Sequence, residues 1–203
     1  MPTVKRPDRL VVAAFWVYVL VIIFGIFLKA TAPEDLIENY LTYKLYYTER
    51  ERLMLHMNPL GFLKTVDFSQ GFNYGWFWEL ILNIIVFIPF GILLPNLFRG
   101  RAVVLKTFLA SLFFSALVEI SQYLTIIGAW DTLDVIANSL GGLLGGIIYA
   151  IFARLIRLPK ILYKILTVIF LCVSSTLLTY LTVNAAIHLD VYVYILSGKV
   201  PEV

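Results

Sequence analysis

The sequence has few charged residues, and this shortage indicates its class. Only 14% of its 203 residues are Asp, Glu, Lys or Arg, while 61% are hydrophobic. Soluble domains carry about 25% charged residues. The composition therefore indicates an integral membrane protein. The net charge of +3 is too small to indicate a nucleic-acid partner.

Cysteine and familiar catalytic motifs are also scarce. The single cysteine, Cys172, excludes an internal disulfide and a cysteine metal cluster, and its apolar surroundings favour a small buried residue over a reactive thiol. The sequence contains no G-x-S-x-G, H-E-x-x-H or P-loop motif. His56 and His188 have a spacing typical of no known site. Whether the protein is an enzyme therefore stays open.

Five apolar segments approach or exceed the roughly 20 residues that a membrane span needs. Helices are expected, because lipid offers no hydrogen-bond partner to the backbone of an open strand. We predict an all-α integral membrane protein, a five-helix transmembrane bundle that forms a single domain over residues 1–203. The segments are Leu10–Leu28, Trp76–Leu97, Val103–Thr125, Asp134–Ile156 and Ile161–Ala186.

Basic residues predict the orientation of these spans. They gather before the first span, between the second and third, and between the fourth and fifth, while the connection from the third to the fourth has none. Because Lys and Arg are enriched in cytoplasmic loops, we predict a cytoplasmic N-terminus and an outer C-terminus. Ala30 and Ala32 resemble a signal-cleavage site, but the first apolar run exceeds the roughly 7–15 residues usual there. The basic residues are Lys5, Arg6, Arg9, Arg99, Arg101, Lys106, Arg154, Arg157, Lys160 and Lys164.

Residues 29–75 form a predicted outer segment between the first two spans. Its first half, "EDLIENYLTYKLYYTERERLML", has the pattern of an amphipathic helix, and its second half is aromatic with Gly and Asn breaks. Such composition is typical of chain at the headgroup level. The segment is predicted to be either a lid over the bundle or a simple interfacial anchor.

Polar side chains recur near the outer ends of three predicted spans. Within each span they share a helix face. An acidic residue at mid-helix costs roughly 2.5–3.5 kcal/mol, so we expect an outward-facing acidic and amide cavity that binds a polar ligand. The alternative is that they hydrogen-bond helices together, at about 0.6 kcal/mol per contact. The candidates are Glu79, Asn83, Ser115, Glu119, Gln122, Asp131, Asp134 and Asn138.

Glycine and proline mark structural positions in the second and fourth spans. Two overlapping GxxxG pairs, Gly141/Gly145 and Gly142/Gly146, allow another backbone to approach closely. A proline inside the second span removes a backbone hydrogen bond and predicts a kink, which either provides a hinge or merely shapes packing. The second-span residues are Pro89, Gly91 and Pro95.

Three motifs in this order, "NIIVFIPFGILLP", "SALVEISQ" and "DTLDVIANSLGGLLG", resemble the VanZ-like family of bacterial membrane proteins. The resemblance covers about residues 52–155, where "HMNPLGF" looks like a degenerate form of a further family segment. Many members have an Arg before the first aspartate, whereas this chain has Gly128 and Ala129, which favours a cationic, hydroxyl-rich or neutral ligand over an anion. The family pattern falls on Asn83, Pro89, Gly91, Pro95, Glu119, Gln122, Asp131, Asp134, Asn138, Gly141 and Gly145.

The resemblance implies a multi-pass protein of the bacterial plasma membrane. The family's namesake is associated with reduced susceptibility to the glycopeptide teicoplanin, so the resemblance also implies a role in tolerance of this antibiotic. Three functions follow as hypotheses: binding of a lipid-linked cell-wall precursor headgroup or glycopeptide, modification of an envelope lipid, or scaffolding of another membrane protein. In the enzyme hypothesis Glu119 and Asp134 act as acid and base or hold Mg²⁺ or Ca²⁺. Otherwise no cofactor is expected. Membrane lipid is the expected partner, and the oligomeric state stays open.

Overall fold

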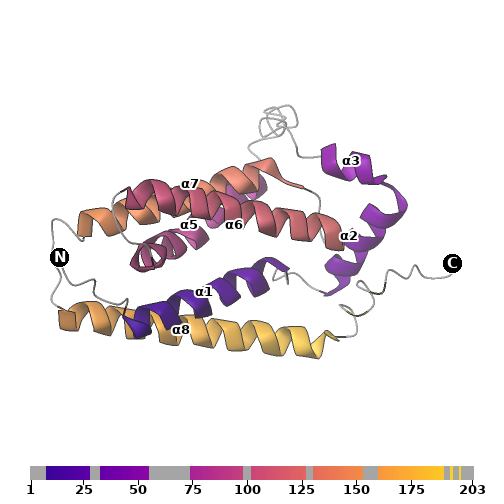
Figure 1. Ribbon diagram of the computed structural model, residues 1–203. Coiled ribbons are helices and arrows are strands. Elements are labelled where there is room, and N and C mark those ends of the chain that lie inside the picture. Colours follow the sequence, from indigo (N-terminus) through magenta and orange to yellow (C-terminus); the bar gives the residue numbers. More distant parts are fainter. Residues whose placement is uncertain are drawn as a thin grey trace.

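The computed structural model describes residues 8–27, 33–54, 74–97, 102–126, 130–152, 160–189, 193 and 197. Within these ranges the secondary structure is helical, and no β-sheet is present (Figure 1). The helices are α1 (Arg9–Phe27), α2 (Pro33–Leu45), α3 (Glu49–Met54), α5 (Tyr74–Leu93), η1 (Leu94–Asn96), α6 (Val103–Thr125), α7 (Thr132–Ile151) and α8 (Lys160–Ile187).

Four helices are long and apolar enough to cross a membrane. They lie over Phe77–Asn96, Val103–Thr125, Thr132–Ile151 and Lys164–Ile187. The apolar stretch of α1, Arg9–Gly25, is shorter. The predicted all-helical membrane architecture is therefore confirmed for these four helices, and a fifth span stays a prediction.

Helix α7 packs between α5 and α6, and its two GxxxG pairs face different neighbours. A Cβ on Gly141 or Gly145 would collide with backbone carbonyls of α5. A Cβ on Gly142 would collide with the side chain of Ser111 on α6, and one on Gly146 would also meet α6 closely. The four glycines thus let α7 approach two helices at once.

The turn around Pro89 of α5 contacts both α7 and α1. On the side that faces α7, a Cβ on Gly91 would collide with the backbone of Gly142. Toward α1, the hydroxyl of Tyr18 donates to the carbonyl of Val86, at 2.7 Å. Pro89 removes the hydrogen bond to the carbonyl of Ile85, four residues before it. The Tyr18 hydroxyl joins this weakened turn to α1 through the next carbonyl, that of Val86. The expected kink itself stays a prediction.

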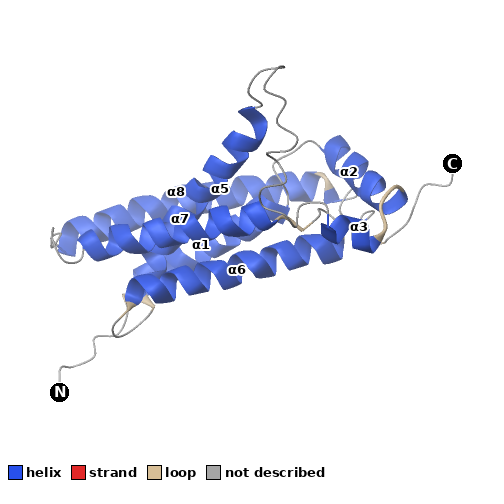
Figure 2. Ribbon diagram, turned by 90° about the horizontal axis from the view of Figure 1, so that it is seen from above, coloured by secondary structure: helices blue, strands red, loops and turns tan. Residues whose placement is uncertain are grey.

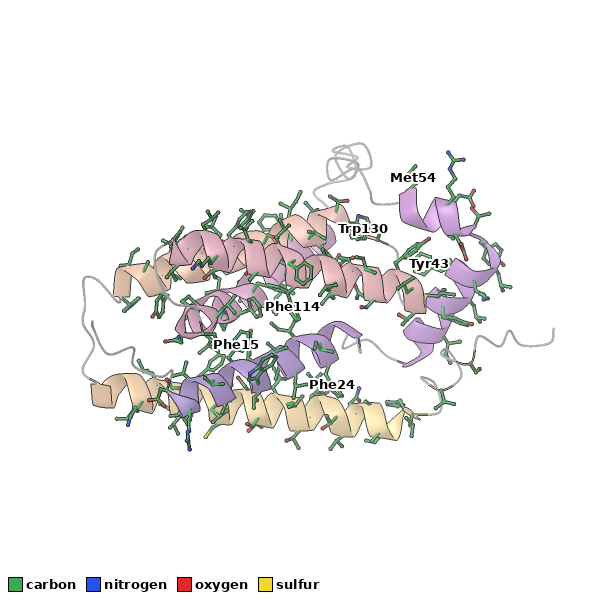
Figure 3. All side chains as sticks on the ribbon, in the orientation of Figure 1. Phe15, Phe24, Tyr43, Met54, Phe114 and Trp130 are labelled. Atoms are coloured by element: carbon green, nitrogen blue, oxygen red, sulfur yellow. The ribbon has the colours of Figure 1, made fainter. Side chains whose placement is uncertain are left out.

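Bulky apolar side chains join α1 to α5, α6 and α8. The ring of Phe15 on α1 lies 5.4 Å from that of Phe90, and Phe90 stacks on Phe114 of α6 at 5.1 Å. Figure 3 labels Phe15 and Phe114. In both ribbon views α1 and α8 lie side by side (Figures 1 and 2). Other buried members of this cluster are Val11, Ala14, Val19, Val21, Ile22, Phe87, Leu93, Leu94 and Leu181.

Helix α8 corrects one expectation. Cys172 was expected to be buried, but its side chain is exposed. The reason is that α8 packs on α1 through other positions, which include Leu181 and the buried Ser174. Cys172 therefore lies on a face that is available to lipid.

Two short helices from the predicted outer segment lie at one end of the bundle (Figure 1). Helix α3 begins with a reciprocal cap, in which Glu51 N–H donates to the Thr48 hydroxyl and Thr48 N–H donates to the Glu51 carboxylate. The hydroxyl of Tyr123, near the end of α6, donates to the carbonyl of Glu49 at 3.1 Å. This bond ties α3 to the end of α6. Residues 55–73, with His56, lie outside the described part of the chain.

Candidate functional site

The site begins where α7 begins. Asp131 caps this helix, because its carboxylate accepts from the backbone N–H groups of Leu133 and Asp134, at 2.8 and 3.3 Å. A carboxylate at this position satisfies donors that the helix leaves unpaired and complements the helix dipole. Trp130 precedes the cap, at the end of the bundle that also carries Tyr43 and Met54 (Figure 3). Asp131 is therefore partly a structural residue.

Glu119 links α6 to this cap. Its side chain is 3% exposed, and its carboxylate accepts from the backbone N–H of Asp131 at 3.0 Å. The positive end of the α7 dipole favours the negative charge. Glu119 is thus a buried acid whose burial is compensated by a helix N-terminus.

Asn83 supplies the contribution of α5. Its Nδ2 donates to the carboxylate of Asp134 at 2.6 Å. This hydrogen bond joins residues 51 positions apart and brings α5 into the same group of polar side chains as α6 and α7. Three helices therefore meet through acidic and amide groups, as the sequence predicts.

Asn138 lies one turn further along α7. Its Nδ2 donates to the hydroxyl of Ser115 at 2.9 Å, and both side chains are buried. Its carbonyl oxygen, Oδ1, is buried and has no hydrogen-bond partner among the described residues. A buried acceptor without a donor costs about 1–3 kcal/mol, which makes this atom the least satisfied polar group on α7.

The pairing of α6 with α7 has a regular antiparallel register. Each step of four residues along α6 meets a step of four back along α7, through small or polar side chains. Continued by one step, this register sets Glu119 opposite Asp134, so two carboxylates on adjacent helices share one level. The observed pairs are Thr107 with Gly146, Ser111 with Gly142, and Ser115 with Asn138.

The remaining predicted residues differ in exposure. Gln122 is buried at 5% exposure, one turn beyond Glu119. Glu79 has an exposed side chain one turn before Asn83, so its assignment to the site stays a prediction. The sequences of α5 and α7 contain no Lys, Arg or His, and the one basic residue of α6, Lys106, lies near its opposite end. The polar side chains that these three helices bring to this end are therefore acids and amides.

A metal site has no support from these side chains. Across the described ranges, no three His, Cys, Asp or Glu residues are grouped so that they could hold a metal ion. An arrangement of hydrogen-bond acceptors in a low-dielectric setting can instead bind donors: hydroxyl, amide or ammonium groups.

Two features were missed by the sequence analysis. Thr107 and Ser111 were not singled out, although with Ser115 and Glu119 they recur every four residues and so share one face of α6. The cap of α3 was also missed, although Thr48 and Glu51 have the S/T-x-x-E spacing.

Helices of this length and hydropathy, joined at one end by polar side chains, define an integral membrane protein. The model of the VanZ/LLP1 family matches residues 15–153, so this chain belongs to that family. Protein VanZ of Enterococcus faecium is 44% identical over 77 residues, which are 38% of this chain and 47% of that protein. The match thus spans about half the length of this relative. No solved structure matches the chain.

Proposed function

We propose that the protein is a multi-pass protein of the bacterial plasma membrane that binds the polar part of an envelope ligand at the outer ends of α5, α6 and α7. The ligand is the headgroup of a lipid-linked cell-wall precursor or a glycopeptide, and its binding contributes to tolerance of teicoplanin. One observation carries the proposal: Asn83, Glu119 and Asp134 come from three helices into one hydrogen-bonded group.

The choice of side chains supports binding over simple helix association. Amides alone would suffice to bond helices, at about 0.6 kcal/mol per contact. Carboxylates are far more expensive in an apolar bundle, yet Glu119 is almost fully buried and Asp134 half-buried. Carboxylates that are costly to bury and yet share one level are typical of a site that serves a ligand.

The attachment of α3 supports a site close to one membrane surface. Tyr123, which bonds to α3, lies one turn from Glu119 on the α6 sequence. The outer segment thus reaches the same end of the bundle as the acidic group. In this proposal it forms one wall of the entrance, at the headgroup level.

The proposed topology has five spans, with the N-terminus inside and the acidic group outside. It is tested with single cysteines, since Cys172→Ala yields a chain without cysteine. Gly128→Cys should react with a membrane-impermeant maleimide on intact cells, and Gly100→Cys should react only after permeabilisation. The opposite pattern would place the acidic group on the cytoplasmic side and would rule out an outer ligand.

The binding function is tested with Glu119→Gln and Asp134→Asn. Each substitution keeps the shape and an acceptor oxygen but removes the charge, so we expect a folded protein. Binding of teicoplanin to the purified protein should weaken at least about tenfold, which corresponds to about 1.4 kcal/mol. Teicoplanin tolerance of expressing cells should fall accordingly. Ser139→Ala is the control, because the Ser139 hydroxyl bonds within its own helix.

The binding proposal is wrong if Glu119→Gln and Asp134→Asn bind teicoplanin and protect cells as well as the parent chain and the Ser139→Ala control do. A scaffold function is then the second candidate. It is favoured by the contacts among the polar groups themselves, such as Asn138 with Ser115. A scaffold function predicts that another membrane protein co-purifies with this chain in stoichiometric amount. The Glu119→Gln variant should retain this partner.

A further inference from the structure

Three consecutive bulky side chains are exposed together at the end of α2. Leu45 is 53% exposed, Tyr46 78% and Tyr47 36%. Single apolar side chains are common on protein surfaces that face water, but a run of three is expected only where it makes a contact. We call Leu45, Tyr46 and Tyr47 the outer patch.

The outer patch lies away from the side of α2 that packs on protein. Tyr40 marks the packed side, since its side chain is 1% exposed. The N–H of Tyr46 donates to the carbonyl of Thr42 at 3.0 Å, so the helical turn continues past Leu45. At about 100° per residue, Leu45 and Tyr46 lie about 120–140° around the helix from Tyr40. Helix α2 therefore has a side that packs on protein and a side that does not.

One face of α6 gives the level of the bilayer core. Bulky apolar side chains are exposed along this face from Leu105 to Leu124. At a rise of about 1.5 Å per residue the face is about 28 Å long, close to the roughly 30 Å of hydrocarbon in a bilayer. Leu124, which is 70% exposed, thus lies at the edge of the hydrocarbon. The face includes Leu105, Leu109, Phe113, Leu117, Ile120 and Leu124.

Helix α3 joins the outer patch to this edge. The hydroxyl of Tyr123, the residue before Leu124, donates to the carbonyl of Glu49 at 3.1 Å. Tyr47 comes two residues before Glu49, and two residues of chain span at most about 7 Å. The outer patch therefore continues the lipid-facing surface of α6 to the level of the headgroups.

The chemistry of the outer patch fits that level. A tyrosine has an apolar ring and a polar hydroxyl, and tyrosines are enriched where hydrocarbon meets water. The exposed charges beside the patch have both signs, as the charges of zwitterionic headgroups do. They are Lys44, Glu49, Arg50 and Glu51.

We propose that the outer patch inserts into the headgroup layer of the surrounding bilayer and anchors α2 and the start of α3 to the lipid surface. The inference goes beyond the proposed function, because it needs no ligand. Helix α3 is then held from two sides, by Tyr123 of α6 and by lipid. The bilayer itself thus helps to position the segment at the end of the bundle.

The first experiment measures the depth of the outer patch. Tyr46→Cys in the Cys172→Ala chain is labelled with a bimane fluorophore and placed in phosphatidylcholine nanodiscs. Quenching is compared for a nitroxide on the lipid headgroup, a nitroxide at the middle of the acyl chain, and iodide in the water. We expect the headgroup nitroxide to quench most strongly. A probe at Leu144→Cys, on the exposed face of α7, is the control and should be quenched most by the acyl-chain nitroxide.

Every other ranking for the Tyr46 probe overturns the proposal. Strongest quenching by iodide places the outer patch in water, and strongest quenching by the acyl-chain nitroxide places it in the hydrocarbon. Absence of quenching by all three shows that protein covers the patch, as in contact with a second copy of the chain.

The second experiment tests the anchoring effect. Amide exchange of the full chain is measured in the same nanodiscs. The double variant Tyr46→Ser with Tyr47→Ser should lower the protection of α2 amides at least about tenfold. The double variant Tyr46→Trp with Tyr47→Trp should keep it, because tryptophan suits the headgroup level equally well.

Tyr180→Ser is the matched control, since it removes an exposed tyrosine from α8 and should leave the α2 amides unchanged. Parent-like protection of α2 in the double serine variant overturns the proposal. If that variant loses protection in α6 and α7 as well, the quenching experiment decides alone.

Discussion

The molecule has two parts that differ in how their helices pack, one around α7 and one around α1. Around α7 the contacts are made by glycines, hydroxyls and amides, as where Gly142 meets Ser111 and Asn138 meets Ser115. Around α1 they are made by large apolar side chains, as where Phe15 meets Phe90. Both parts are helix packing, yet the surfaces that meet in them have little in common.

The difference shows how one chain separates a precise part from an adaptable part. Backbone contacts at glycine leave no rotamer to adjust, and hydrogen bonds require a fixed geometry. Aromatic and aliphatic side chains tolerate repacking when their volume is kept. The candidate site lies in the first part, where the distances between helices are fixed.

The largest expected effect comes from Gly91→Ala, which breaks the contact between α5 and α7. In Gly91→Ala the new Cβ would collide with the backbone of Gly142, which cannot move without separating the helices. We expect a loss of about 3 kcal/mol or more, since overpacking against side chains alone costs about 1–3 kcal/mol. Thermal unfolding in detergent measures it.

Gly25→Ala is the matched control on α1. Its Cβ would lie 3.9 Å from Leu181, an ordinary contact, so stability should stay equal or rise by about 0.5–1 kcal/mol. Equal losses in the two variants would remove the proposed distinction between the parts.

The second effect concerns the polar link between α5 and α7. Asn83→Leu removes the donor to Asp134 and leaves a half-buried carboxylate without that bond, so we expect a loss of about 1–3 kcal/mol. The double variant Asn83→Leu with Asp134→Leu should recover most of it, because both polar partners are gone. A double variant less stable than either single variant would contradict this account.

The third effect tests a polar contact of the α1 part. Tyr18→Phe removes the hydrogen bond to the carbonyl of Val86 beside Pro89 and should cost about 0.5–1.5 kcal/mol. Tyr180→Phe, on an exposed face of α8, is the control and should change nothing. If the Tyr18 variant unfolds at the parent midpoint, the turn before Pro89 needs no support from α1.

The smallest effect is local to α3 and depends on pH. Hydrogen bonds from the backbone and hydroxyl of Thr48 hold the pKa of Glu51 below its ordinary value of 4.5. A depressed pKa stabilises the fold at pH values above 4.5, and this contribution is lost as the pH falls through the lower value. The protection of α3 amides, relative to their intrinsic exchange rate at each pH, should therefore fall as the pH drops below 4.5. Glu51→Gln should remove this pH dependence, while Glu38→Gln on α2 should keep it.

Apolar length predicted the bounds of α5 and α6 closely. The predicted Val103–Thr125 coincides with α6, and the predicted Trp76–Leu97 begins two residues after α5 and ends one residue after η1. Length and composition suffice because a bilayer imposes one thickness on every crossing helix. Helix α7 begins two residues before the predicted Asp134, since the Asp131 cap starts the helix earlier than its apolar run suggests.

Which helices pair, and in which register, could not be predicted. A four-residue spacing shows that Ser115 and Glu119 share a face, but the identity of the opposite helix depends on the packing of the whole bundle. The same limit applies to Asn83, whose contact with Asp134 spans 51 residues of chain. Local pattern thus gave the residues that share each helix face, while their pairing across helices is a property of the fold.

The glycines of α7 also bear on how this family can diversify. Because Gly141 and Gly145 touch one neighbour and Gly142 and Gly146 the other, the helix is held from two sides and its distances from both neighbours are set. A change in the polar group would therefore have to come from exchange of side chains on the N-terminal side of Asn138, while the helices around them keep their positions.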